Sequence, residues 1–246
     1  MLAIDINCDV GEGIANEEQI MSFISSCNIA CGGHAGSINS IDETIKTALK
    51  YNLKIGAHPS FPDVKNFGRK VMKISDKELQ RSIENQLNLC IQRVHLADGK
   101  LHHVKTHGAL YNLSSTDKNI AKTVVNAVKN TISDVFLYVP FNSVIEKIAV
   151  DNNIKIIYEG FADRNYTAEG KLVSRKEKNA LITDKNNVFE HLYKMITSQK
   201  VTTVSGDEIA IKAQTFCIHG DNPKVVEILQ FITKELQKRD KKIKGV

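Results

Sequence analysis

The chain opens with the segment Leu2-Ala-Ile-Asp-Ile6-Asn-Cys-Asp9-Val-Gly11-Glu12-Gly13, in which an apolar run passes directly into polar residues and glycines. Residues 2–6 have the length and composition of a buried strand. The glycines that follow permit a sharp turn and the close approach of a ligand. Asp9 and Glu12 add two carboxylates to this turn. The segment therefore predicts a strand that ends in a loop with ionisable side chains.

This order of strand, polar turn and helix recurs along the chain. Apolar runs predict strands at residues 2–6, 27–30, 53–57, 103–106, 135–139, 154–159 and 215–218. Segments with helical period follow most of them, at about residues 17–26, 41–51, 76–97, 117–131, 142–151, 187–198 and 223–239. This alternation is typical of an α/β protein with a parallel sheet. Because barrels of this kind reach about 250 residues as one domain, we expect residues 1–246 to form a single domain.

Local signals mark the starts of several elements. Ser40-Ile-Asp-Glu43 and Ser75-Asp-Lys-Glu78 both fit a capping box, in which the hydroxyl and the carboxylate each bind a free backbone amide. Asn222-Pro223 fits an N-cap followed by proline at the first helical position. Residues 201–205 and 209–211 predict a small hairpin inserted before the last strand.

The composition is that of a globular protein with its excess charge at one end. Hydrophobic residues make up 42% of the chain and charged residues 25%, so a sizeable core can form. Of the formal charge of +5, residues 234–246 supply six cations and two acids. Cations near a helix C-terminus suit its dipole, which predicts a solvated tail. A nucleic-acid face would run along the fold with interleaved aromatic residues, so we expect no nucleic-acid partner.

The cysteines and the start of the chain indicate the compartment. The five cysteines, Cys8, Cys27, Cys31, Cys90 and Cys217, lack the spacing of a disulfide framework. The first ten residues have no basic and apolar leader. No apolar run approaches the ~18 residues that a membrane span needs. We therefore expect a reduced, cytoplasmic protein with no membrane partner.

The turns after six of the predicted strands carry ionisable side chains beside glycines. These side chains are Asp9 and Glu12, His34, His58, His107, Asp163 and Arg164, and His219 and Asp221, in strand order. Because parallel strands of such folds end on one face, we expect the side chains to converge on one site. Two plainer interpretations stay open: Asp9 and Glu12 could cap the first helix, and Asp221 could only start the last one.

Lys105 and Glu159 lie at the ends of two of these same strands, residues 103–106 and 154–159. A charged residue on a buried strand is costly unless it is paired or faces a polar cavity. The inward-facing ends of barrel strands supply such a cavity, so we expect both residues at the site.

Several familiar catalytic patterns are missing from the sequence. There is no Gly-x-x-x-x-Gly-Lys-Ser/Thr phosphate loop, and Gly11 with Gly13 lacks the third glycine of a dinucleotide turn. The sequence contains neither a Gly-x-Ser-x-Gly elbow nor a His-Glu-x-x-His pair. Serine-nucleophile hydrolysis and dinucleotide-dependent oxidoreduction therefore lack their signatures.

At the strand ends the sequence resembles the LamB/YcsF family. The matching segments keep the family order and cover nearly the whole chain: residues 5–13, 28–32, 34–36, 55–63 (Ile-Gly-Ala-His-Pro-Ser-Phe-Pro-Asp), 67–69, 107–112 (His-Gly-Ala-Leu-Tyr-Asn), 161–166, 170–175 and 219–221 (His-Gly-Asp). Where the family usually has Lys-Pro-His-Gly, this chain has Thr106, and Gly33, Lys70 and Asn179 also depart from the usual pattern. None of these departures removes an ionisable strand-end residue.

The resemblance implies a distorted TIM-barrel-like fold of about seven parallel strands, similar to the glycoside hydrolase/deacetylase superfamily. It also implies the A component of an ATP-dependent 5-oxoprolinase that works with subunits B and C. ATP would then be a co-substrate. The residues that would carry acid–base and phosphate chemistry are Asp9, His58, Lys105, His107, His219 and Asp221. Those that would bind substrate are Asn7, Glu12, Asn28, His34, Arg69, Glu159, Asp163, Arg164 and Arg175.

Two other functions remain open. A metal-dependent amidohydrolase or deacetylase could use Asp9, Glu12, His34, His58 and His219 as a mixed oxygen and nitrogen site for a divalent ion. A non-catalytic component could instead hold a ligand in the pocket while its partners perform the chemistry, and the missing nucleotide motifs favour this. Metal analysis of the purified protein separates the first alternative from the lactam hydrolase.

Overall fold

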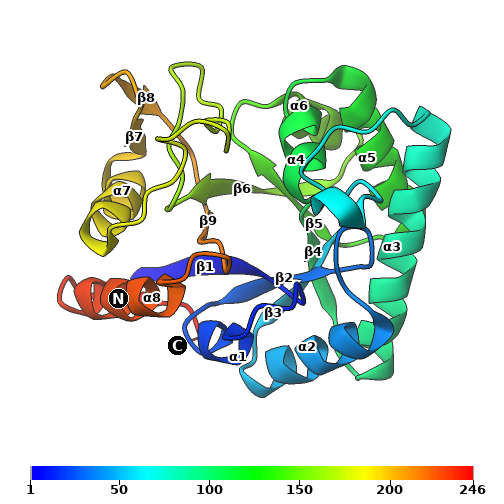
Figure 1. The fold of residues 1–246 in the computed structure, drawn as a ribbon, viewed down its shortest axis with the longest axis horizontal. Helices are drawn as coiled ribbons and strands as arrows, with labels where there is room; N and C mark the ends of the chain where they lie inside the picture. The colour runs from blue at the N-terminus through cyan, green and yellow to red at the C-terminus, as the bar shows by residue number, and fades with distance from the viewer. Residues whose placement is uncertain (1, 246) are drawn as a thin grey trace.

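A computed structural model, which describes residues 2–245, has a closed barrel of parallel strands at its centre (Figure 1). The barrel strands are β1 (Leu2–Val10), β2 (Ser26–Ala30), β3 (Lys54–His58), β4 (Leu101–Val104), β5 (Phe136–Pro140), β6 (Lys155–Phe161) and β9 (Thr215–Cys217). Each pairs with the next in this order, and β9 closes the ring by pairing with β1. The prediction of a barrel of about seven parallel strands is confirmed.

Helices surround the barrel, and Figure 1 shows them on the outside of the strands. They are α1 (Glu17–Met21), α2 (Ile38–Lys50), α3 (Asp76–Leu96), α4 (Gly108–Ser114), α5 (Lys118–Thr131), α6 (Val144–Asp151), α7 (Lys185–Ser198) and α8 (Val225–Gln237), with a 3₁₀ turn at Val64–Asn66. The amphipathic helix α2 buries Ile41, Ile45 and Ala48 against the strands. All residues of β2 and β9 are buried, as is usual when a parallel sheet is covered by helices.

Some of the predicted element boundaries are wrong. The first helix ends at Met21 and not at residue 26, because Ser26 already belongs to β2. The capping box of α2 joins Ser37 to Ser40, so the helix starts three residues before the predicted start. The box of Ser75 and Glu78 is confirmed. Helix α8 begins at Val225, two residues after the predicted start. Residues 222–224 form a turn instead, in which the Asn222 side chain accepts the Lys224 backbone N–H.

Three elements lie outside the barrel pattern. The hairpin of β7 (Lys200–Thr202) and β8 (Glu208–Ala210) is antiparallel, as predicted. Strand β10 (Lys241–Ile243) pairs with Leu2–Ile4 of β1. The prediction of a solvated tail is therefore wrong at Ile243, which is buried, whereas Lys242 is exposed as predicted. No helix in the described part of the chain has the length and apolarity to cross a membrane.

Candidate active site at the mouth of the barrel

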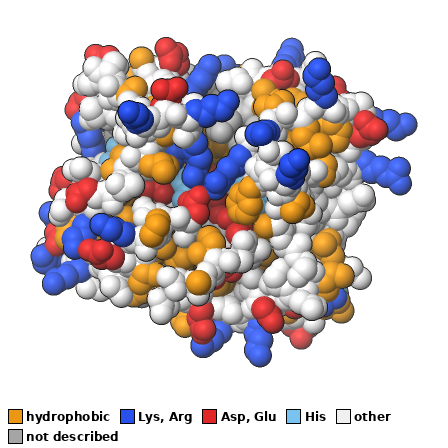
Figure 2. Space-filling model, in the orientation of Figure 1, with side chains coloured by type: hydrophobic (Ala, Val, Ile, Leu, Met, Phe, Trp, Pro, Cys, Tyr) orange, Lys and Arg blue, Asp and Glu red, His pale blue; other side chains and the backbone are white. Residues whose placement is uncertain are grey.

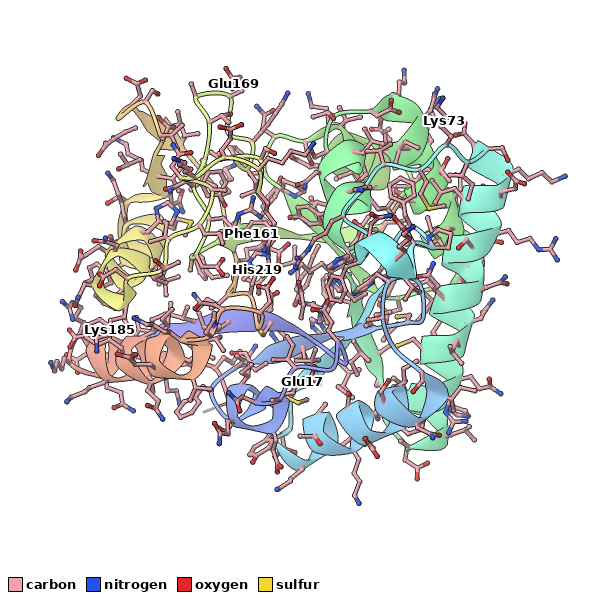
Figure 3. The ribbon with its side chains drawn as sticks, in the orientation of Figure 1. Glu17, Lys73, Phe161, Glu169, Lys185 and His219 are labelled. Atoms are coloured by element: carbon pink, nitrogen blue, oxygen red, sulfur yellow. The ribbon has the colours of Figure 1, made fainter. Side chains whose placement is uncertain are left out.

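The carboxyl ends of the strands bring the predicted ionisable residues to one mouth of the barrel. Eight residues from across the chain meet there: Asp9, His34, His58, Lys105, His107, Glu159, Asp163 and His219. Figure 3 shows two residues of this region, His219 and Phe161, side by side near the centre of the molecule. The cleft above them has a volume of about 710 Å³, which is within the range of small-molecule sites.

The ammonium group of Lys105 lies at the centre of the site and is almost wholly buried. Its Nζ is 3.0 Å from Asp9 Oδ1 and 2.9 Å from Glu159 Oε1. Burial opposes its charge, but the two carboxylates more than compensate, so the pKa of Lys105 lies well above its usual value. The same balance acts on Asp9: burial raises its pKa, and the charges of His58 and Lys105 hold it well below the ordinary range. Both groups are therefore ionised at neutral pH.

Two asparagines support this charged group from below, inside the barrel. Asn28 Nδ2 donates to Asn7 Oδ1 and to Asp9 Oδ1, each at 2.8 Å. Asn7 Oδ1 also accepts from Lys105 Nζ at 3.2 Å. Both side chains are fully buried, so the structure places Asn7 and Asn28 beneath the cleft as supports of Asp9 and Lys105. Direct contact with a substrate, which we predicted, is not supported by this position.

Three histidine rings stand together beside Asp9. The rings of His34 and His107 are stacked with centroids 3.7 Å apart, and His58 Nε2 lies 2.9 Å from His107 Nδ1. The His34 Nε2 atom is 2.9 Å from Glu12 Oε1. Burial is the first cause that lowers the pKa of His107 well below its usual value. Glu12, His34, His58 and His107 each offer a donor atom within 4.8 Å of the others.

Backbone carbonyls fix the orientation of two of these rings. His58 Nδ1–H donates to the Lys105 carbonyl at 2.7 Å, and His107 Nε2–H donates to the Phe67 carbonyl at 3.0 Å. A carbonyl has no proton to give, so in a neutral ring the opposite nitrogen carries a lone pair. These opposite nitrogens, His58 Nε2 and His107 Nδ1, face one another. A proton or a cation is therefore required between them.

Phe67, which orients His107, was missed as a site residue. Its backbone is left-handed, with φ of 54°, a conformation that is rare for a bulky side chain. Its ring packs edge-on against His34 and His107. The neighbouring Gly68 carbonyl would lie 2.7 Å from a Cβ on Gly108, so glycine is required at residue 108 for this loop to approach. The only sequence signal for a role of Phe67 at the site was the family-matching segment Phe67-Gly68-Arg69.

His219 and Asp163 form a second pair at the mouth, and His219 offers a ring nitrogen within 4.8 Å of donor atoms of Asp9 and Cys217. The Asp163 carboxylate accepts both the backbone N–H and the Nδ1–H of His219, each at 2.9 Å. Burial raises the pKa of Asp163, but His219 more than offsets this and lowers it. The side chain of Arg164 lines the cleft, yet it donates to the carbonyls of Val173 and Ala180. Two of its N–H groups thus hold the loop of residues 165–182.

The rim of the cleft carries a group of charges that are partly exposed. Asp221 Oδ2 is 2.6 Å from Arg69 Nη2 and 3.2 Å from Arg175 Nη1. Figure 2 shows basic and acidic side chains gathered around the hollow at the centre of this face, with a histidine visible inside it. The structure thus places Asp221 at the rim between two arginines, farther out than the other residues predicted for proton transfer.

A further missed residue is His103, which lies inside the barrel. Its Nε2 is 2.7 Å from Asn28 Oδ1, and its ring stacks on Tyr138 with centroids 3.9 Å apart. A Cβ on the neighbouring Gly56 would lie 2.1 Å from the ring. Gly56 is therefore required to make room for His103, and this glycine within a strand was the available signal.

One known family accounts for nearly the whole chain, since the LamB/YcsF family model matches residues 4–246. This chain belongs to the LamB/YcsF family. The A subunit of 5-oxoprolinase from Bacillus cereus (strain B4264) is 40% identical over 238 residues, which cover 94% of each chain. The protein of the same name from Bacillus cytotoxicus is 38% identical over 237 residues, again 94% of each chain.

Solved structures agree with the fold. The lactam utilization protein from Thermus thermophilus superposes with a TM-score of 0.92 at 30% identity and covers 100% of both chains. A GH113 β-1,4-mannanase reaches a TM-score of 0.50 at 11% identity, covering 94% of this chain and 99% of its own. At that identity the mannanase supports only the barrel fold.

Proposed function

We propose that this LamB/YcsF protein is the A component of a 5-oxoprolinase and opens the 5-oxoproline ring to glutamate with consumption of ATP. The observation that carries the proposal is the buried Asp9–Lys105–Glu159 group beside three histidines, in a chain 40% identical to the A component of a 5-oxoprolinase. The lactam is the stable form of this amino acid, so its opening needs coupling to ATP. Phosphorylation of the amide oxygen would make the carbonyl carbon electrophilic.

The site has the two kinds of group that this reaction needs. Lys105 offers a cation to a developing negative charge on the substrate, and the rim residues Arg69 and Arg175 offer partly exposed cations to phosphate or carboxylate oxygens. His58 and His107 offer ring nitrogens for proton transfer to water or to the departing ring nitrogen. His219, oriented by Asp163, offers a third ring nitrogen near Asp9.

The proposal includes two partner subunits, B and C, and a cytoplasmic location. The relatives are named as one component of a larger enzyme, and the sequence has no recognisable nucleotide loop. The test is an assay of 5-oxoproline-dependent ATP hydrolysis with this chain alone and then with its partners. We expect little turnover from the isolated chain and full activity from the assembled enzyme. Full ATP-coupled activity from the isolated chain would remove the need for B and C.

A metal-dependent amidohydrolase is the second candidate, and one observation favours it. When both rings are neutral, the lone pairs of His58 Nε2 and His107 Nδ1 face one another beside the carboxylate of Glu12, 3.6 Å from His107 Nδ1. Histidines that bind metal usually donate their other N–H to a carbonyl or carboxylate, as these two do. Donor atoms around a tetrahedral zinc ion stand about 3.3 Å apart, since each bond is about 2.0–2.1 Å. The donor set of imidazole nitrogens and a carboxylate therefore fits a divalent ion such as zinc, which is intermediate between hard and soft in its ligand preference.

The metal set differs from the one that we expected. His107 joins Glu12, His34 and His58, whereas Asp9 and His219 group with Cys217. A bound divalent ion would activate water or polarise the amide carbonyl. Elemental analysis of the purified chain tests this: about one equivalent of metal, lost in His58→Ala and retained in His102→Ala, supports it. A metal-free chain that is fully active in the assembled enzyme excludes it.

A further inference from the structure

A second cavity lies beside the main cleft and is not used by the proposed chemistry. Its volume is about 390 Å³. Tyr111, Phe161 and Leu172 line both cavities, so the two are neighbours with a common wall. Tyr166 and Ile209 line only the second cavity, which we call the inner chamber. Asp9, His58 and Lys105 line only the main cleft.

Glu159 belongs to the wall of the inner chamber, whereas its ion-pair partner Lys105 faces the main cleft. The three protons of Lys105 are within reach of Asn7 Oδ1, Asp9 Oδ1 and Cys217 Sγ, at 3.0–3.2 Å. Glu159 therefore gains the charge of Lys105 at 2.9 Å, but neither of its oxygens has a hydrogen-bond partner among the described residues. Its side chain is fully buried.

A buried carboxylate without hydrogen bonds is unusual, because each oxygen can accept two and an unmade bond is costly. The Tyr111 hydroxyl in the same wall makes no well-aligned hydrogen bond among residues 2–245. Burial raises the pKa of this phenol well above its usual value, and the hydroxyl stands close enough to Glu159 for that carboxylate to raise its pKa further, so it keeps its proton. The inner chamber thus offers an open acceptor and a polar hydroxyl next to Lys105.

We propose that the inner chamber holds the N–H side of a small cyclic amide, with Glu159 accepting the ring N–H. The inference deepens the proposed function and rests on it. In this pose the amide carbonyl faces the wall that the chamber shares with the main cleft, where Lys105 and the histidines lie. Lys171, which lines both cavities, suits the substrate carboxylate. Once the ring has opened, the nitrogen becomes an ammonium group that Glu159 also stabilises.

The charge of the wall excludes other ligands. A phosphate or carboxylate placed against Glu159 would bring two anions together in a buried space, which is strongly unfavourable. A lactone is also disfavoured, because its ring oxygen presents lone pairs to the carboxylate where the lactam presents an N–H. The inner chamber should therefore distinguish a lactam from the lactone of the same shape.

The test measures binding of 5-oxoproline and of its lactone analogue, 5-oxotetrahydrofuran-2-carboxylate, to the full chain by calorimetry. We expect the lactam to bind at least about 10-fold tighter, as for a hydrogen bond to a charged acceptor. In Glu159→Gln the ratio should fall to about 1–3, because the amide can turn either its C=O or its NH₂ to the ligand. An unchanged ratio in Glu159→Gln overturns the proposal.

Two further variants keep the test decisive if Glu159→Gln does not fold. Ile209→Trp fills the inner chamber without a contact in the main cleft, and it should weaken lactam binding at least 10-fold. Glu227→Gln is the matched control: Glu227 lies on α8, lines neither cavity and pairs with Lys185 on the surface. Its ratio should equal that of the unmodified chain. Lactam binding that survives Ile209→Trp overturns the proposal.

The proposed function can fail separately. If the assembled enzyme opens 5-oxoproline with an unchanged KM in Ile209→Trp, the function stands and the inner chamber is not the substrate site. If the chain binds neither compound and the assembled enzyme does not turn over the lactam, both proposals are overturned.

Discussion

The two ends of the barrel interior both hold a buried carboxylate paired with a lysine, but they differ in how completely their polar atoms are satisfied. At the lower end, Asp5 Oδ1 accepts from Ser26 and Thr215, each at 2.7 Å, and its other oxygen pairs with Lys54. At the mouth, Lys105 pairs with Glu159, whose oxygens have no hydrogen bond from the described residues.

This difference separates structural polar groups from functional ones. A buried carboxylate whose oxygens all have protein partners needs no ligand and contributes to a defined barrel. Open acceptors and facing lone pairs, as at Glu159 and between His58 and His107, are costly in the free protein. Such open polar atoms are expected where a substrate, a proton or a cation supplies the missing partner. Both ends have a buried carboxylate and a lysine, so hydrogen-bond satisfaction is the better guide to the site.

The largest expected effect is at the mouth. His107→Ala should lower turnover of the assembled enzyme about 100-fold or more, the usual contribution of general acid–base catalysis. The melting temperature should change little, because His107 is neutral and its removal leaves no unpaired charge. Steady-state kinetics and thermal melts check this, with His102→Ala as the control from the lower end. A His107→Ala protein that simply unfolds would make His107 a structural residue.

Asp9→Ala should also lower turnover about 100-fold. Lys105 keeps Glu159 as a counter-ion, so the protein should still fold. Kinetics of the assembled enzyme and a urea titration of the isolated chain separate the two quantities. Loss of stability with unchanged turnover per folded molecule would contradict the prediction.

Asp5→Ala should show the opposite pattern at the lower end. Three donors lose their acceptor, so the free energy of unfolding should fall by about 2–3 kcal/mol. Turnover per folded molecule should stay within about twofold. Urea titrations give the stability, and Lys54→Met in the same background should recover part of it by removing the unpaired cation. A loss of turnover as large as that of His107→Ala would end the distinction between the two ends.

Arg69→Gln tests the rim, where the effect should be smaller. The Arg69–Asp221 pair is partly exposed, and exposed pairs contribute up to about 1 kcal/mol. We expect KM to rise about fivefold with little change in kcat or in melting temperature. The difference from the unmodified enzyme should shrink at high salt, because screening weakens exposed charges. A fall in kcat above 100-fold would move Arg69 into the chemistry itself.

The smallest effect concerns pH and the histidines away from the mouth. Burial lowers the pKa of His102 and of His191 to about 4. Both rings are neutral in the folded protein, whereas the unfolded chain takes up protons below its pKa of about 6.5. Stability is therefore complete above about pH 6.5 and is lost as pH falls toward 4. Melting temperatures from pH 7 to 5 should fall by a few degrees, and by less in His191→Gln.

The sequence alone determined the barrel and the set of strand-end residues. The apolar runs with polar, glycine-rich turns after them sufficed, because parallel strands of a closed barrel must end on one face. Hence Asp9, His58 and His219 could be assigned to one mouth from positions that are about 50 to 210 residues apart. The family motifs covered the loops as well, and they pointed to residue 67.

Only the tertiary structure decided which of these residues contact one another and which polar atoms remain open. The orientation of His107 depends on a carbonyl at Phe67, and the space for His103 depends on a glycine of the neighbouring strand. Strand β10 forms because the end of the basic tail pairs with residues 2–4 of β1, which lie outside the pairing of β1 with β9. Such contacts join residues that are remote in the chain. Local propensity and periodicity cannot predict these contacts, because the packing of the whole barrel decides which polar atoms find a hydrogen-bond partner.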